Sequence, residues 1–262
     1  MDTVAHDGRE TAYRVVGEAA DESGATVLYV HGSGATHRVW GAQYGPDGPA
    51  HPAVALDLSG HGASDDGETE PGPEALATYA RDVISVAEAT GADVLVGNSL
   101  GGAVCLHVAC ETDFDPAGLV LAGTGAKLAV HEDLREWLTE DFERAVEFLH
   151  GPDRLFHDID DRTLERSKRA MRETGQAVTR RDFLTCHRFD VRDRLDEIVA
   201  PTLAVVGEHD GLTPPPYHEY LAEETGGEYV EIASAAHLAM VERPRAFNRA
   251  VASFLAEISG GQ

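Results

Sequence analysis

Residues 94–102 read VLVGNSLGG, in which a short apolar run leads into the pattern Gly-x-Ser-x-Gly and then into a helical segment. A serine on so tight a turn between a strand and a helix projects its hydroxyl outward from a strained backbone. Gly97 and Gly101 permit the turn, because a Cβ at either position would obstruct the packing of the helix against the strand. The motif therefore predicts a nucleophile, Ser99, at the end of a buried strand.

Short apolar runs alternate with helical segments on both sides of this turn. Residues 11–16 are expected to form an antiparallel edge strand, and the apolar periodicity of residues 73–89 predicts a helix. Strands that alternate with helices favour a mainly parallel, doubly wound sheet. The predicted parallel strands are residues 26–30, 53–57, 93–96, 119–122, 202–206 and 228–232, and the last helix covers residues 244–258.

The alternation stops between residues 127 and 194, where the sequence has helical periodicity and no strand signal. Apolar residues between 134 and 149 recur mostly at spacings of three and four, the pattern of a helix with one apolar face. Further helices are expected over residues 162–172 and 180–186. We interpret residues 127–194 as a helical cap inserted into the sheet domain.

A serine hydroxyl needs a base, and the base needs a third group that orients it. The active edge of a parallel sheet lies at the carboxyl ends of its strands, so both groups are expected directly after a strand. Asp210 follows the apolar run 202–206, and His237 follows the run 228–232. The chain order serine, aspartate, histidine is typical of this kind of serine turn. Glu208 is a competing candidate for the acid.

The tetrahedral intermediate of acyl transfer needs two hydrogen-bond donors aimed at its oxyanion. One is expected from the backbone N–H of Leu100, the residue after the nucleophile. The other is assigned to the backbone N–H of Ser33, in the loop after the first parallel strand, where Gly32 and Gly34 leave the backbone open to a ligand. Together with the serine, acid and base, these donors predict acyl-transfer chemistry.

Five motifs in this order resemble those of the α/β-hydrolase superfamily across nearly the whole chain. They are HGSG at 31–34, DLSGHGAS at 57–64, GNSLGG at 97–102, GEHD at 207–210 and HLAMVERP at 237–244. The resemblance implies an α/β fold with a mostly parallel, eight-stranded sheet and flanking helices, formed by residues 1–126 and 195–262, with the cap inserted between them. Within the superfamily the chain resembles small capped carboxylesterases, enol-lactonases and C–C bond hydrolases.

These residues predict a serine hydrolase that cleaves a small ester, thioester or lactone through an acyl-enzyme on Ser99. C–C bond hydrolysis and cofactor-free perhydrolase chemistry would use the same residues, and a non-catalytic ligand-binding module is the alternative from another class. Trp137 and Phe142, on the apolar face of the cap, are expected to line the acyl pocket. The expected partner is a small-molecule acyl substrate, whose acyl and leaving groups the sequence leaves open, as it does the oligomeric state.

The composition adds constraints of another kind. Aspartate and glutamate total 46 and lysine and arginine 21, which gives a net charge of −25. A surface this acidic repels nucleic acid and anionic lipid. The composition resembles that of cytoplasmic proteins from extreme halophiles, and an acidic protein of a mesophile is the alternative. No transmembrane helix or signal peptide is expected, so the predicted location is cytoplasmic. The three cysteines fit no metal motif, and neither a metal nor a cofactor is expected.

Overall fold

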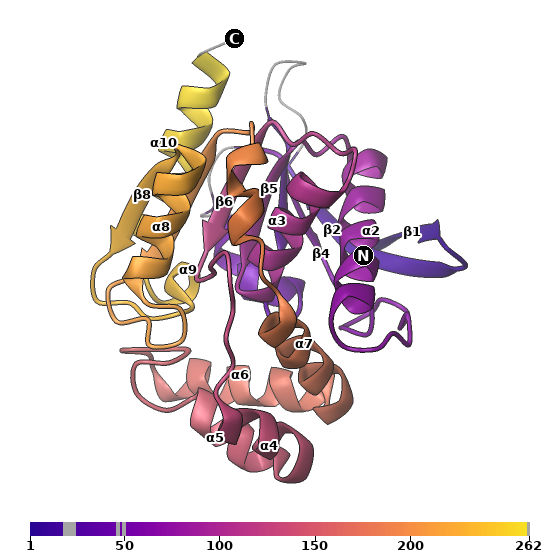
Figure 1. Cartoon of the computed structure of the whole chain (residues 1–262), viewed down its shortest axis with the longest axis vertical. Coiled ribbons are helices and arrows are strands. Elements are labelled where there is room, and N and C mark those ends of the chain that lie inside the picture. Colours follow the sequence, from indigo (N-terminus) through magenta and orange to yellow (C-terminus); the bar gives the residue numbers. More distant parts are fainter. Residues whose placement is uncertain (18–24, 46–47, 49–50, 261–262) are drawn as a thin grey trace.

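A computed structural model describes residues 1–17, 25–45, 48 and 51–260 of the chain (Figure 1). Its centre is an eight-stranded sheet with the strand order β1-β2-β4-β3-β5-β6-β7-β8. The pairs from β4 to β8 are parallel, whereas β2 is antiparallel to β4 and β1 is antiparallel to β2. The predicted fold class is confirmed. The strands are β1 (Asp2–His6), β2 (Arg9–Val16), β3 (Val27–Val30), β4 (Ala53–Leu56), β5 (Val94–Asn98), β6 (Gly118–Ala122), β7 (Thr202–Gly207) and β8 (Glu228–Ile232).

Helices cover both faces of the sheet and bury its central strands (Figure 1). Successive side chains of a strand point to opposite faces, so Leu95 packs in one core with α2, α3 and α8, whereas Val94 and Val96 pack in the other with α10. No helix in the described ranges has the length and apolar composition needed to cross a membrane. The covering helices are η1 (His37–Trp40), α1 (Gly41–Tyr44), α2 (Pro73–Thr90), α3 (Leu100–Glu111), η2 (Arg192–Glu197), α8 (Pro215–Thr225), α9 (Ala239–Glu242) and α10 (Pro244–Gly260).

The position of β2 differs from the sequence prediction in one respect. The strand is antiparallel as expected, but β1 pairs with its outer side, so the edge of the sheet is β1 and not residues 11–16. Asp7 and Gly8 join the two strands with φ of 48° and 77°. An Asp-Gly pair with two positive φ angles is the preferred two-residue hairpin turn. That dipeptide is the sequence signal from which β1 was predictable.

Four α-helices and then η2 lie between β6 and β7, and Figure 1 shows α4, α5 and α6 gathered at one end of the molecule. The sequence predicted one helix over residues 134–149, but the chain forms two, because Asp141 ends the first and caps the second by accepting a hydrogen bond from the Arg144 N–H. The helices expected over 162–172 and 180–186 are present and longer. The four are α4 (Glu132–Glu140), α5 (Phe142–Leu149), α6 (Asp161–Thr174) and α7 (Gln176–Arg188).

Candidate active site

Ser99 occupies the sharp turn between β5 and α3, with φ 55° and ψ −116°. This backbone conformation is strained for a residue with a side chain. The fold holds it through a hydrogen bond from the Ser99 N–H to the Ala122 carbonyl (2.9 Å) and one from the Thr124 hydroxyl to the Ser99 carbonyl (2.9 Å). A Cβ at Gly97 would meet the Gly101 carbonyl, which explains the glycine two residues before the serine. The turn therefore has the conformation that its sequence predicts.

Asp210 and His237 meet although they lie in loops after different strands. His237 Nδ1 is 2.9 Å from Asp210 Oδ2, and both side chains are buried. The carboxylate also accepts hydrogen bonds from the Leu212 N–H (2.9 Å) and from the N–H (2.9 Å) and hydroxyl (2.8 Å) of Thr213. These donors fix the carboxylate, and the carboxylate in turn fixes the imidazole.

The charge of Asp210 determines which nitrogen of His237 carries the proton. Burial by itself would raise the pKa of Asp210, but His237 and the hydrogen bonds from Thr213 outweigh it and lower the pKa. An anionic carboxylate favours the proton on Nδ1 and leaves Nε2 free to accept another. The competing acid, Glu208, is directed elsewhere, because its carboxylate accepts a hydrogen bond from the Ser234 N–H (2.9 Å).

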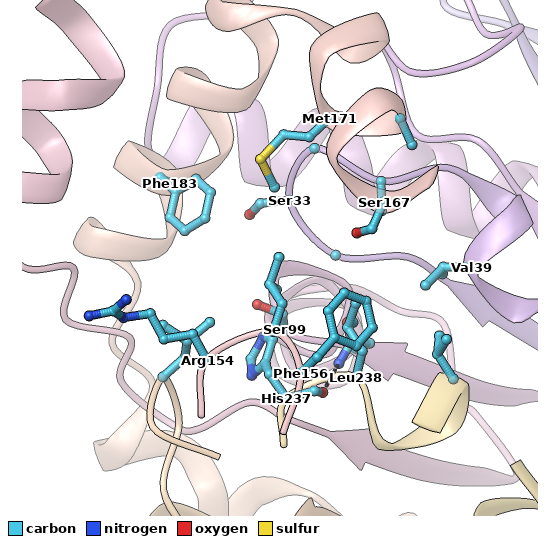
Figure 2. A pocket seen from close by; sticks show the side chains of 18 of the residues that line it. Ser33, Val39, Ser99, Arg154, Phe156, Ser167, Met171, Phe183, His237 and Leu238 are labelled. Atoms are coloured by element: carbon cyan, nitrogen blue, oxygen red, sulfur yellow. Dashed lines mark hydrogen bonds between the residues drawn. The ribbon is translucent and has the colours of Figure 1, made fainter. Parts of the chain in front are cut away.

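The loop that follows β3 lies directly against the Ser99 turn. A Cβ at Gly32 would be 3.1 Å from Ser99 Cβ, so the two backbones approach as closely as a glycine allows. Ser33 follows in this loop and lines the same pocket as Ser99 and His237 (Figure 2). Leu100 is the first residue of α3, so its N–H is one of the donors that a helix leaves unpaired at its N-terminus. The structure thus brings the five residues of the predicted reaction centre to one place.

A pocket of about 1010 Å³ is lined by Ser99 together with residues of the predicted sheet domain and of the predicted cap, 127–194. Among the described residues its lining does not include Trp137 or Phe142, the two residues predicted there. The Trp137 ring packs against Phe148, with centroids 5.2 Å apart. The prediction treated residues 134–149 as a single helix with one apolar face. Because the chain forms two helices there, α4 and α5, the apolar side chains of this segment do not all share one face. The apolar side chains that line the pocket include Val39, Leu134, Phe148, Phe156, Met171, Phe183 and Leu238.

One cluster of possible metal ligands lies outside this pocket. Asp153, His157 and His209 each place one ligand atom within 4.8 Å of the others. His157 Nδ1 is 2.6 Å from Asp153 Oδ1, and the two imidazole rings stack with centroids 3.8 Å apart. These mutual contacts account for the arrangement, so we assign no metal to it.

Comparison with known proteins identifies the family. The description "Alpha/beta hydrolase family" belongs to the family model that matches residues 27–250. The chain belongs to the α/β-hydrolase family. It is 30% identical over 247 residues to a pimeloyl-[acyl-carrier protein] methyl ester esterase of Neisseria meningitidis, covering 84% of this chain and 73% of the relative.

Two further likenesses extend along nearly the whole chain of this α/β hydrolase. A 2-hydroxy-6-oxo-6-(2'-aminophenyl)hexa-2,4-dienoic acid hydrolase of Metapseudomonas resinovorans is 28% identical, with 95% of this chain and 88% of the relative covered. The solved structure of a thermophilic esterase superposes with a TM-score of 0.85 at 30% identity, covering 98% of this chain and 97% of that one. The relatives include esterases, so this α/β hydrolase is a hydrolytic enzyme.

Proposed function

We propose that this α/β hydrolase cleaves a small ester, thioester or lactone through an acyl-enzyme on Ser99. The observation that carries the proposal is the buried Asp210–His237 pair, 2.9 Å apart, in the same site as the strained Ser99 turn. A nucleophile, a base and a group that orients the base are the elements that acyl transfer by serine requires. Esterases among the relatives agree with this chemistry.

In the proposed reaction, Ser99 Oγ attacks the acyl carbon while His237 Nε2 takes the hydroxyl proton. The N–H groups of Leu100 and Ser33 stabilise the oxyanion of the tetrahedral intermediate. The bond to the leaving group then breaks, and His237 returns its proton to that group. Water repeats both steps on the acyl-enzyme, which releases the acid and regenerates Ser99. Throughout, the carboxylate of Asp210 stabilises the imidazolium.

The charge of the pocket narrows the proposed substrate. The whole chain is strongly acidic, yet within the described part of the chain the pocket lining contains one acidic residue, Glu173, and several arginines. Arg154 is held against Phe148, where its guanidinium donates to the backbone carbonyl (2.8 Å). The other arginines of the lining have exposed side chains that are available to a ligand. These arginines are Arg38, Arg166 and Arg169. We propose an acyl substrate of modest length that carries an additional anionic group, such as a carboxylate.

C–C bond hydrolysis is the second candidate function, and the dienoic acid hydrolase among the relatives favours it. It would use the same three residues, because the nucleophile and the base act on a carbonyl group in both reactions. Perhydrolase chemistry would again use them, whereas a non-catalytic binding module would have no need of a buried acid–base pair beside a strained serine. Turnover of a substrate panel that contains both esters and diones distinguishes ester hydrolysis from C–C bond hydrolysis.

The deciding experiment labels Ser99 with a fluorophosphonate and measures turnover of p-nitrophenyl esters of increasing chain length. We expect labelling of the wild type and no labelling of Ser99→Ala. Both Ser99→Ala and His237→Ala should lose about 10⁴- to 10⁶-fold in kcat, because members of such a unit act together. Near-wild-type turnover by Ser99→Ala would contradict the proposal.

We further propose a salt-rich cytoplasm as the working environment, with neither nucleic acid nor a membrane surface as partner. A net charge of −25 destabilises a compact chain by self-repulsion unless salt screens it. The free cysteines Cys105, Cys110 and Cys186 are buried, which suits a reducing compartment. The melting temperature should rise between about 0.1 M and above about 1 M KCl, as the screening length falls from about 10 Å to about 3 Å. A melting temperature that stays constant or falls would refute this environment and leave the hydrolase proposal unaffected.

A further inference from the structure

The loop that carries Ser33 is held by the cap at the next residue, Gly34. The Gly34 N–H donates a hydrogen bond to Asp182 Oδ2 of α7 (3.0 Å). The Gly34 carbonyl accepts one from the hydroxyl of Thr174, the last residue of α6 (3.2 Å). Both backbone polar groups of one core residue are therefore bound by side chains of two cap helices.

Asp182 belongs to a buried hydrogen-bond network. Its side chain is fully buried, and it also accepts a hydrogen bond from the Tyr79 hydroxyl (2.7 Å) and lies 2.9 Å from His61 Nε2. His61 Nδ1 faces the Ser59 carbonyl at 3.1 Å. Both ring nitrogens of His61 thus face acceptors, which is the arrangement of a protonated imidazole. The network joins a cap helix to two core loops.

The carboxylate of Asp182 remains charged in this environment. Burial by itself would raise the pKa of Asp182, but His61 and the hydrogen bonds from Tyr79 and Gly34 outweigh burial and lower the pKa. A hydrogen bond to an ionised acceptor is roughly twice as strong as one between neutral groups. The Gly34 N–H therefore has a strong and directional partner.

The packing around Gly34 leaves the loop little freedom to adjust. Gly34 has φ +66°, and a Cβ there would be 3.1 Å from Met171 Cγ and 3.2 Å from the hydroxyl oxygen of Thr179. Figure 2 shows Met171 and Ser33 on the same side of the pocket, across from His237. The cap thus contacts the Ser33 loop through packing as well as through hydrogen bonds.

We infer that Asp182 and Thr174 are positioning residues for the oxyanion donor of this hydrolase: by holding Gly34 they set the direction of the Ser33 N–H. The inference rests on the proposed function of Ser99 and Ser33. A donor acts only if it points to where the oxyanion forms, and removal of a whole donor costs about 10²- to 10³-fold in kcat. A donor that is present but poorly aligned should cost less, about 10-fold.

The test uses Thr174→Val, which removes one hydroxyl and keeps the shape of the side chain, and Asp182→Asn, which removes the charge. Thr225→Val is the matched control, because Thr225 is likewise the half-buried last residue of a helix, α8, and its hydroxyl bonds to the Leu221 carbonyl of that helix. We expect Thr174→Val to lower kcat on p-nitrophenyl esters about 10-fold with KM changed less than about twofold. Asp182→Asn should lose at least as much, and Thr225→Val should match the wild type.

A second readout separates positioning from a general loosening of the cap. A fluorophosphonate places its phosphoryl oxygen in the oxyanion site when it reacts with Ser99, so its labelling rate should fall in parallel with kcat. If the cap contact serves folding alone, the variants would lower the melting temperature and raise KM while kcat and the labelling rate stay at wild-type values. That result would overturn the inference.

The outcomes for this inference and for the proposed function are distinguishable. If Ser99→Ala is inactive and Thr174→Val retains wild-type kcat, the inference fails and the serine mechanism stands. If Ser99→Ala is as active as the wild type, the proposed function fails first. Should Asp182→Asn not fold, Thr174→Val and its labelling rate decide the question, because a hydroxyl-to-methyl change at a half-buried position preserves packing.

Discussion

The sheet domain of this α/β hydrolase and the cap helices α6 and α7 are held by different kinds of contact. Strands β3, β5, β6 and β7 are buried along their whole length, and most residues of α3 are buried and apolar or small. In the cap, α6 buries one residue, Met171, among the residues described. The buried residues of α7 are mainly polar; they are Thr179, Arg181, Asp182, Thr185 and Cys186.

This difference has a physical consequence for each region. Apolar packing is non-directional and scales with the buried area, so it gives the sheet domain its stability. Buried polar groups are directional, and a partner left without a hydrogen bond costs about 1–3 kcal/mol. The junction of α6 and α7 with the core therefore contributes orientation more than stability. The core should control whether the reaction occurs, and the cap should control its efficiency and its substrate.

After Ser99→Ala and His237→Ala, the largest expected effect tests the acid assigned to the core. Asp210→Asn should lower kcat by roughly 10³- to 10⁴-fold, because a neutral amide no longer favours the proton on His237 Nδ1. Glu208→Gln is the control and should stay within about twofold, since Glu208 bonds to the Ser234 N–H. Steady-state kinetics on one p-nitrophenyl ester measure kcat for both variants. The reverse ranking of the two variants would transfer the role of the acid to Glu208.

The next effect concerns the acyl pocket under the cap. Phe183→Ala should raise KM for esters of medium chain length by roughly 10-fold, since an apolar contact in such a pocket discriminates by about 1–3 kcal/mol. Trp137→Ala should change chain-length preference less than Phe183→Ala, because Trp137 does not line the pocket and acts on it through Phe148, against which its ring packs. KM and kcat of both variants are measured on p-nitrophenyl esters from acetate to octanoate. If Trp137→Ala shifts the preference more than Phe183→Ala, the cap is arranged differently around the substrate.

A pH-dependent effect on stability tests the polar junction of cap and core. Burial alone would lower the pKa of His61, but Asp182 and the Ser59 carbonyl outweigh it and raise the pKa above 6.5. The stabilisation from His61 is therefore complete below pH 6.5 and is lost as the pH rises through the raised value. The partner Asp182 has a lowered pKa, so its contribution is complete above pH 3.8 and is lost as the pH falls through the lowered value.

Urea unfolding of the wild type and of His61→Gln between pH 5 and pH 9 measures this contribution. The difference in unfolding free energy should be largest near pH 5 to 6 and should shrink toward pH 9, by about 1.4 kcal/mol for each unit by which the pKa is raised. Thr225→Val, which removes no titratable group, is the control and should show a constant difference. A constant difference for His61→Gln would mean that folding does not raise the pKa of His61, and a difference that grows toward pH 9 would mean that folding keeps the imidazole neutral.

The smallest expected effect concerns the arginines at the pocket. The double variant Arg166→Gln/Arg169→Gln should raise KM by about 3- to 10-fold for a p-nitrophenyl half-ester of glutaric acid and leave p-nitrophenyl pentanoate unchanged, because an exposed charge pair contributes at most about 1 kcal/mol. Arg245→Gln, on α10, is the matched control. Equal effects on the charged and the neutral ester would contradict the proposed anionic group.

Local sequence patterns were sufficient to predict those features of this enzyme that are determined by residues close together in the sequence. The Ser99 turn, the alternation of strands and helices and the loops after the strands each depend on residues within a few positions of one another. The sheet topology then follows, because parallel strands joined by helices have few allowed arrangements. That topology also explains why Asp210 and His237 were predictable from their places after two strands. The Asp7–Gly8 turn carried a local signal of the same kind for β1.

Only the tertiary structure determined how the cap meets this framework. Asp141 divides a continuous apolar pattern into α4 and α5, and the new angle between them places Phe148, and not Trp137, at the pocket. The bonds from Gly34 to Thr174 and Asp182 join residues 140 and 148 positions apart. A buried polar contact produces no periodic pattern in the sequence, because it depends on how two elements that are distant in the sequence pack against each other. The sequence by itself therefore determined the fold and the candidate reaction centre, and the packing of the cap decided the pocket and the support of the Ser33 loop.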